Sequence, residues 1–154
     1  MAATPPTPYS AWVISGKLLI GDAFTSDGQA CATIRGADIG AVICFSDNDT
    51  GFEEAKSLVG GTNVSAELSR KDEDMAAAAK RAAEHIKAGR PVFVYDGEAA
   101  AVLACLVLGL LQAKGSSAEA ITHVQAAWRS RLVRSGGVNP ASKRSVEQIE
   151  RLFK

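Results

Sequence analysis

A short polar loop between a buried strand and a buried helix constrains this chain more than any other segment. The stretch reads Pro91-Val-Phe-Val-Tyr-Asp-Gly-Glu-Ala-Ala-Ala-Val-Leu-Ala-Cys-Leu-Val-Leu-Gly-Leu-Leu111. Such a junction is typical of an anion-binding site, because free backbone amides and the positive end of the helix dipole meet there. Here it carries two carboxylates, Asp96 and Glu98, and no basic residue. The position is typical of an active site, but the expected chemistry is missing.

Composition predicts one compact domain. The chain has 154 residues, 47% of them hydrophobic, which is enough for a single core. Its 17 Lys and Arg balance 17 Asp and Glu, so we expect no nucleic-acid partner. The longest apolar run, 99–111, is shorter than the roughly 20 residues that cross a bilayer, so we expect no membrane association. Three scattered cysteines and no signal peptide predict reduced thiols in the cytoplasm.

Local patterns predict alternating strands and helices. Two apolar triplets, 12–14 and 18–20, flank Ser15-Gly-Lys17 and predict a hairpin. Further strands are expected at 41–45, 64–68 and 92–94, and helices at 26–36, 52–59, 72–87, 98–115, 116–128 and 139–153. This order predicts a single α/β domain over residues 11–154, with helices on both faces of a mixed sheet. The proline-rich residues 1–10 are expected to be disordered.

The order and spacing of these elements resemble the dual-specificity branch of the cysteine-dependent protein phosphatases over residues 12–153. The segments that carry the resemblance are Leu18-Leu-Ile-Gly21, Ala41–Ser46, Ala82-Ala-Glu-His-Ile86, Pro91–Tyr95, Gly115–Val124 and Val138–Phe153. The resemblance implies a three-layer α/β/α fold of the protein tyrosine phosphatase type. Its central sheet would be mixed, mostly parallel and five-stranded.

The family's catalytic loop reads HCxxGxxR followed by Ser or Thr. Its thiolate attacks phosphorus, its arginine clamps the phosphate, its hydroxyl assists departure of the cysteine, and a distant aspartate protonates the leaving group. The corresponding vestigial loop here comprises Tyr95, Asp96, Gly97, Glu98, Ala99, Ala100, Ala101, Val102 and Leu103. By this correspondence Asp96 replaces the cysteine, Val102 the arginine and Leu103 the hydroxyl, while Tyr95 and Ala99 replace the histidine and the glycine. Counting back along the preceding helix places the general-acid aspartate on Ser69.

The resemblance therefore implies a pseudophosphatase. Removing a nucleophile together with its partners costs about 10^4-fold or more in rate. A carboxylate at position 96 would also repel a phosphate dianion by about 1–4 kcal/mol, with no arginine to offset the repulsion. We expect no catalytic residue, cofactor or metal, and a monomer or weak homo-oligomer that binds an unidentified protein. The expected contact surface is the loop around Asp96, flanked by Ser69–Asp74 and Arg129–Arg134.

The two loop carboxylates allow other interpretations. Asp96 and Glu98 could cap the helix amides, or accept a lysine or arginine from a partner. Phosphorylation of Asp96 would require Mg²⁺ ligands and a lysine, which the sequence does not assign. Two alternatives stay open: an α/β enzyme that uses Asp96 for hydrolysis or phosphoryl relay, and a structural subunit of an oligomer.

The remaining reactive side chains have simpler interpretations. Cys105 and Cys44 lie in apolar segments and are expected to pack in the core, and Cys31 is expected to be a reduced thiol. His85 and His123 have no partner at ligand spacing and are expected at the surface. Asp72-Glu-Asp74 is explained by the dipole at a helix start better than by a metal. The basic residues between Arg129 and Lys154 are expected to be solvated or to face an acidic partner.

Overall fold

The N-terminal part of the described chain is the expected hairpin. The computed structural model describes residues 10–21, 29–45, 50–66, 71–95, 97–112, 116–129 and 143–153. Strands β1 (Ser10–Ile14) and β2 (Leu18–Gly21) pair antiparallel. Ser10, expected in the disordered segment, instead pairs with Gly21 and is 1% exposed. The difference arises because Ser10 pairs with the neighbouring strand, and a polar residue next to a proline-rich stretch gives no sign of such pairing. Residues 1–9 lie outside the described part.

The sheet is mixed and mostly parallel, as expected. Strands β3 (Ala41–Cys44), β4 (Val64–Ala66) and β5 (Val92–Tyr95) complete a five-stranded sheet of order β1-β2-β5-β3-β4. Strand β5 lies in the middle, parallel to both β2 and β3, and only β1 runs antiparallel to its neighbour. The central strand therefore delivers its C-terminal end to the middle of one edge of the sheet.

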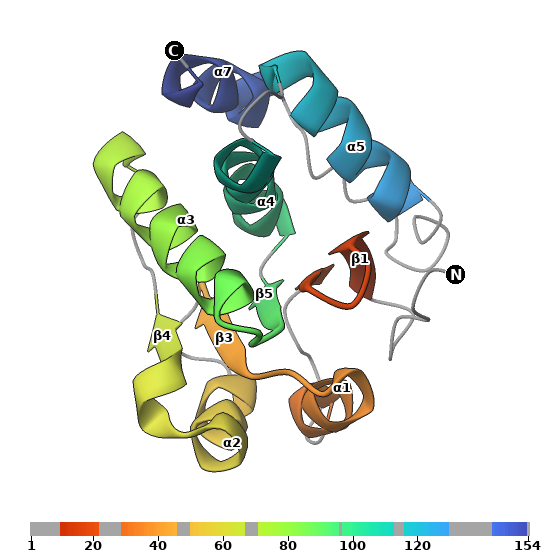
Figure 1. Cartoon of the computed structure of the whole chain (residues 1–154), viewed down its shortest axis with the longest axis vertical. Coiled ribbons are helices and arrows are strands. Elements are labelled where there is room, and N and C mark those ends of the chain that lie inside the picture. Colours follow the sequence, from red (N-terminus) through yellow and green to blue (C-terminus); the bar gives the residue numbers. More distant parts are fainter. Residues whose placement is uncertain are drawn as a thin grey trace.

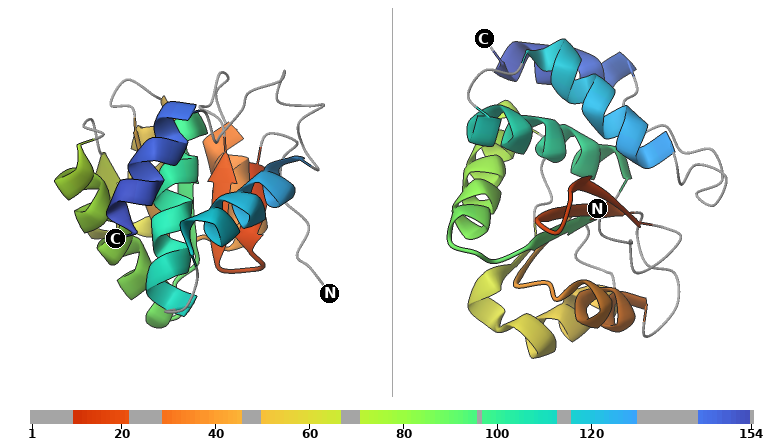
Figure 2. Two further views of the ribbon diagram at one scale, coloured as in Figure 1. Left: turned by 90° about the horizontal axis from the view of Figure 1, so that it is seen from above. Right: turned by 45° about the vertical axis from the view of Figure 1, so that its right-hand side comes forward.

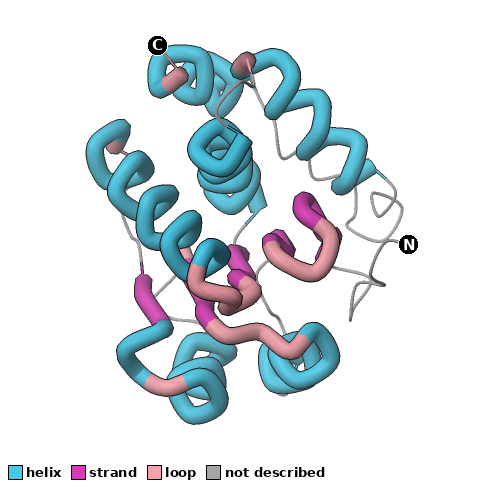
Figure 3. Tube along the Cα trace, in the orientation of Figure 1, coloured by secondary structure: helices cyan, strands magenta, loops and turns pink. Residues whose placement is uncertain are grey.

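The helices agree closely with the predicted ranges. They are α1 (Gln29–Ala37), α2 (Thr50–Val59), the short 3₁₀ helix η1 (Gly61–Asn63), α3 (Asp72–Lys87), α4 (Gly97–Gln112), α5 (Ser117–Arg129) and α7 (Lys143–Leu152). Figure 3 shows how helices surround the strands. The expected start of the last helix at Asn139-Pro140 and the Ser26 cap of the first lie outside the described residues.

Helices cover both faces of the sheet. Helices α1 and α2 lie on one side, and α3, α4, α5 and α7 on the other (Figure 1). Side chains of β5 alternate accordingly, because successive residues of a strand point to opposite faces. Val92 and Val94 belong to the large core under α3 and α4, and Phe93 and Tyr95 to the smaller core on the α1–α2 side. The predicted three-layer α/β class is confirmed.

Helix α4 is the central helix of the larger layer. It packs on β2 and β5 of the sheet and is flanked by α3, α5 and α7 (Figures 1 and 2). Every residue from 99 to 108 is buried, which explains the nearly continuous apolar sequence. Of the helices that the structure describes, none has the length and hydropathy needed to cross a membrane.

Candidate functional site

The candidate site lies at the C-terminal ends of the parallel strands. Tyr95 at the end of β5 is in register with Gly21 of β2 and Cys44 of β3, and its carbonyl accepts a hydrogen bond from the Phe45 N–H at 3.2 Å. A single residue, Asp96, separates β5 from α4. In open parallel sheets ligands bind at this edge, where helix N-termini gather. The backbone thus has the strand–loop–helix geometry that the sequence predicted.

Tyr95, which the family resemblance aligned with the loop histidine, is a core residue. It is 0% exposed and its ring stacks on Phe93, with centroids 5.1 Å apart and an interplanar angle of 29°. The strand predicted from the sequence ended at Val94, but the hydrogen-bonded ladder with β2 and β3 includes Tyr95. The aromatic pair at alternate positions of one strand was a signal for this extra strand residue.

The first turns of α4 are apolar and buried. Ala99 is 6% exposed, and the next four residues, 100–103, are each 1% exposed or less. Val102 and Leu103, which the family resemblance aligned with the arginine and the hydroxyl, belong to the large apolar core. Neither side chain has a donor or acceptor, so neither can hold a phosphate oxygen. This part of the predicted loop packs against the protein itself.

The loop carboxylates are only partly covered by the structure. Asp96 and Ser69 lie outside the described residues, and Gly97 and Glu98 are described only as the first residues of α4. Capping by Asp96 or Glu98, contact with a partner's cation, and the assignment of Ser69 to the general-acid position therefore stay predictions.

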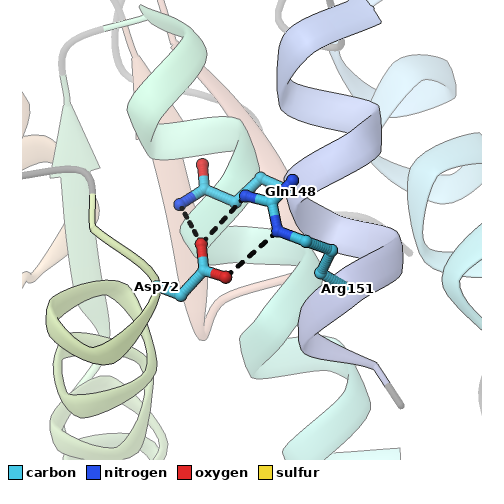
Figure 4. Close-up of polar contacts among 3 residues, drawn as sticks. All are labelled: Asp72, Gln148 and Arg151. Carbon is cyan, nitrogen blue, oxygen red and sulfur yellow. Dashed lines mark hydrogen bonds and ion pairs between the residues drawn. The ribbon is translucent and has the colours of Figure 1, made fainter.

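Asp72, on the expected flank of the site, is bound to the last helix. Its carboxylate accepts two hydrogen bonds from the Arg151 guanidinium, at 3.1 Å from Nε and 3.0 Å from a terminal nitrogen, and one from Gln148 Nε2 at 3.2 Å (Figure 4). The hydrogen bond from Arg151 lowers the pKa of Asp72, and the same bond raises the pKa of Arg151. From the sequence, this acidic turn was attributed to the helix dipole alone, because its partners lie more than seventy residues away.

The cysteines are buried or partly buried, and both histidines make polar contacts. Cys44 and Cys105 are buried, Cys31 is partly exposed, and burial raises the pKa of Cys105 to about 12. His85 accepts a hydrogen bond from Arg90, and His123 contacts the Val13 carbonyl. Within the described ranges, no group of three His, Cys, Asp or Glu is placed to hold a metal ion.

Several solved structures with a similar fold are named as phosphatases. The chain superposes on the PTP-2 phosphatase of Cydia pomonella with a TM-score of 0.70, at 16% identity over 94% of this chain and 90% of that one. Human DUSP28 gives a TM-score of 0.63 at 19% identity, covering 98% and 97%. A mouse putative dual specificity phosphatase complexed with zinc tungstate gives 0.61 at 16% identity, covering 99% and 89%.

Sequence comparison adds nothing to this result: no family model and no curated protein matches the chain. The similarity therefore rests on three-dimensional structure, over nearly the whole length of both partners in each comparison. The chain has the fold of the dual-specificity and protein tyrosine phosphatases.

Proposed function

We propose that this chain is a phosphatase-like domain that does not hydrolyse phosphoesters and that acts by binding a protein partner. The observation that carries the proposal is Val102. It occupies the position of the family's phosphate-clamping arginine, is 0% exposed, and packs in the apolar core. A buried valine offers no donor to a phosphate oxygen, whereas an arginine offers a charged, bidentate fork.

The neighbouring positions support the same conclusion. Leu103 is equally buried where the family has a hydroxyl, and Asp96 stands where it has the thiolate. A carboxylate at a helix N-terminus stabilises the helix by about 0.3–1 kcal/mol, but it repels an incoming phosphate dianion. Because the missing groups act as a unit, the expected loss of rate is about 10^4-fold or more.

The proposed contact surface comprises Asp96 and the first two residues of α4, Gly97 and Glu98. Two carboxylates at the end of the central strand suit a lysine or arginine of a partner protein. Asp72 is left out of this surface, because its carboxylate is already bound by Arg151 and Gln148. The partner's complementary group would therefore meet the loop itself.

Phosphatase assays and ligand titration test the first half of the proposal. We expect no turnover of phosphotyrosine or phosphothreonine peptides above the buffer rate, and no NMR shift of the loop with phosphate or vanadate at millimolar concentration. Turnover that Asp96→Asn removes would overturn the proposal and favour the alternative of an enzyme that uses Asp96. Saturable vanadate binding at the loop would contradict the expected repulsion.

Affinity capture with charge-reversal variants tests the second half. A specific partner should be retained by the wild-type domain and lost with Asp96→Lys or Glu98→Lys. Glu84→Lys is the matched control, because Glu84 is an exposed carboxylate near the far end of α3. A partner lost equally with the control variant, or retained by both loop variants, would contradict recognition through the loop.

A further inference from the structure

A groove between α3, α4 and α7 is lined by small and apolar side chains and one lysine. Its volume is about 360 Å³. Two small residues of α3, Ala76 and Ala79, leave the space open, and Leu106 and Leu110 of α4 form an apolar wall. Leu106 lies nine residues, or about 14 Å, along α4 from its start at Gly97, so the groove is separate from the candidate site.

Contacts between the helices hold the groove open in a defined shape. The Asp72–Arg151 pair joins the start of α3 to the end of α7, with Gln148 adding a third hydrogen bond (Figure 4). The Phe153 ring, which follows α7, packs directly on Gly109 of α4. The contact is so close that a Cβ atom at position 109 would lie only 2.9 Å from the ring. A ligand would therefore enter a preformed site, which lowers the entropic cost of binding.

One charged side chain, Lys80, lines the groove. Lys80 is the single ionisable residue among the described lining residues, it is exposed, and it forms no hydrogen bond or ion pair with any described residue. The Asp72 carboxylate lies eight residues, or about 12 Å, earlier along α3 and is already paired with Arg151. At the rim, Leu110 is 43% exposed and is the one large hydrophobic residue with that exposure in the described part of the chain.

The size of the groove favours a small molecule over a protein. Pockets for small molecules have volumes of roughly 300–1,000 Å³. A stable protein interface uses roughly 20–30 residues on each side, whereas eight described residues line this groove. We propose that the groove binds a small amphiphile with an aliphatic body and a carboxylate head. The body lies against Leu106, Leu110 and Phe153, and the carboxylate pairs with Lys80; this site does not depend on the proposed function of the loop.

Titration of the full chain with decanoate, followed by ¹H–¹⁵N NMR, tests the proposal. We expect saturable shifts at or below about 1 mM, confined to residues of α3, α4 and α7 that line the groove. Decyltrimethylammonium is the matched probe, because it has the same chain and the opposite charge. It should bind about three-fold or more weakly. Shifts scattered over the surface, or equal binding of the two probes, would overturn the proposal.

Two variants locate the head and the body of the ligand. Lys80→Met keeps an aliphatic side chain and should abolish the preference for decanoate, whereas Lys87→Met, on the last turn of the same helix, should leave it intact. Leu110→Gln should weaken both probes, because the exposed apolar rim is lost. Unchanged decanoate binding by Lys80→Met, in a variant with wild-type Tm, would contradict the assigned carboxylate position.

Discussion

At the scale of single residues, the start of α4 packs in the core at the positions that the family resemblance aligned with ligand-binding groups. Val102 and Leu103 are completely buried, and full burial of one such side chain stabilises a fold by about 1.5–3 kcal/mol. Tyr95 adds an aromatic stack with Phe93. The start of α4 therefore contributes to the stability of the core.

His85 makes the stability of the domain sensitive to pH. Its Nδ1 accepts a hydrogen bond from Arg90 Nε at 2.9 Å, so it must be unprotonated in this contact. Burial, followed by repulsion from Arg90, lowers the pKa of His85 below its ordinary 6.5. The unfolded chain therefore takes up this proton more readily, so the contribution is complete above pH 6.5 and falls at lower pH. We expect the urea midpoint to decrease between about pH 7.5 and about pH 5.5.

A variant assigns that pH dependence to the histidine. His85→Gln retains a hydrogen-bonding side chain without a proton that titrates in this range. Its urea midpoint should change less than that of the wild type over the same interval. An identical decrease in both proteins would show that other groups cause the effect and would contradict the assignment to His85.

At the scale of elements, the link between α3 and α7 depends on one carboxylate. Asp72→Asn should lower Tm at neutral pH, because the bidentate pair with Arg151 is lost. The pKa of Asp72 in the folded protein lies below its ordinary 3.8. Its stabilisation is therefore complete above pH 3.8 and is lost as the pH falls through the lower folded value. The difference in Tm between variant and wild type should shrink over that range.

Asp74→Asn is the matched control for this measurement. Asp74 lies in the same first turn and meets the same helix dipole, but it has no hydrogen bond or ion pair with a described residue. Equal losses of Tm in the two variants would mean that the dipole, and not the Arg151 link, provides the stabilisation. Added salt should reduce the effect of Asp72→Asn, since the pair is partly exposed.

Local elements could be predicted from the sequence, whereas their long-range partners could not. The Ser116 cap was visible as a capping box, and the Glu119 N–H indeed donates to Ser116 Oγ at 3.2 Å. The bounds of α3 followed from its acidic start and basic end. By contrast, Glu54 accepts a bond from the Cys31 N–H, 23 residues away, and Asp72 binds Arg151, 79 residues away. Polar pairs at such separations leave no periodic signal along the chain.

At the scale of the whole molecule, the class of fold was predictable but the role of each face was not. Alternating strands and helices indicated an α/β sheet covered on both sides. The apolar run at β5 gave no sign of which residues face which layer, because a strand buried on both faces lacks alternation. For the site, the sequence was enough to predict which residues form the loop at 95–103. That Val102 and Leu103 are fully buried could be seen only in the structure.

Helix α4 contributes to both the candidate site and the groove, and its middle is buried in the core. We therefore expect this helix to become exposed to solvent only when the whole domain unfolds. Cys105 reports on this: it lies in the middle of α4, is 1% exposed, and has a pKa raised by burial to about 12. The Cys105 thiolate reacts with a disulfide reagent, so labelling should occur only after α4 becomes exposed.

In a Cys31→Ser, Cys44→Ser variant, we expect Cys105 to react at about 10^-3 or less of its rate in urea. The free energy of opening from that ratio should equal the global free energy of unfolding measured with urea. A markedly smaller value would show that α4 opens separately, and the preformed groove would then be a transient feature of the fold.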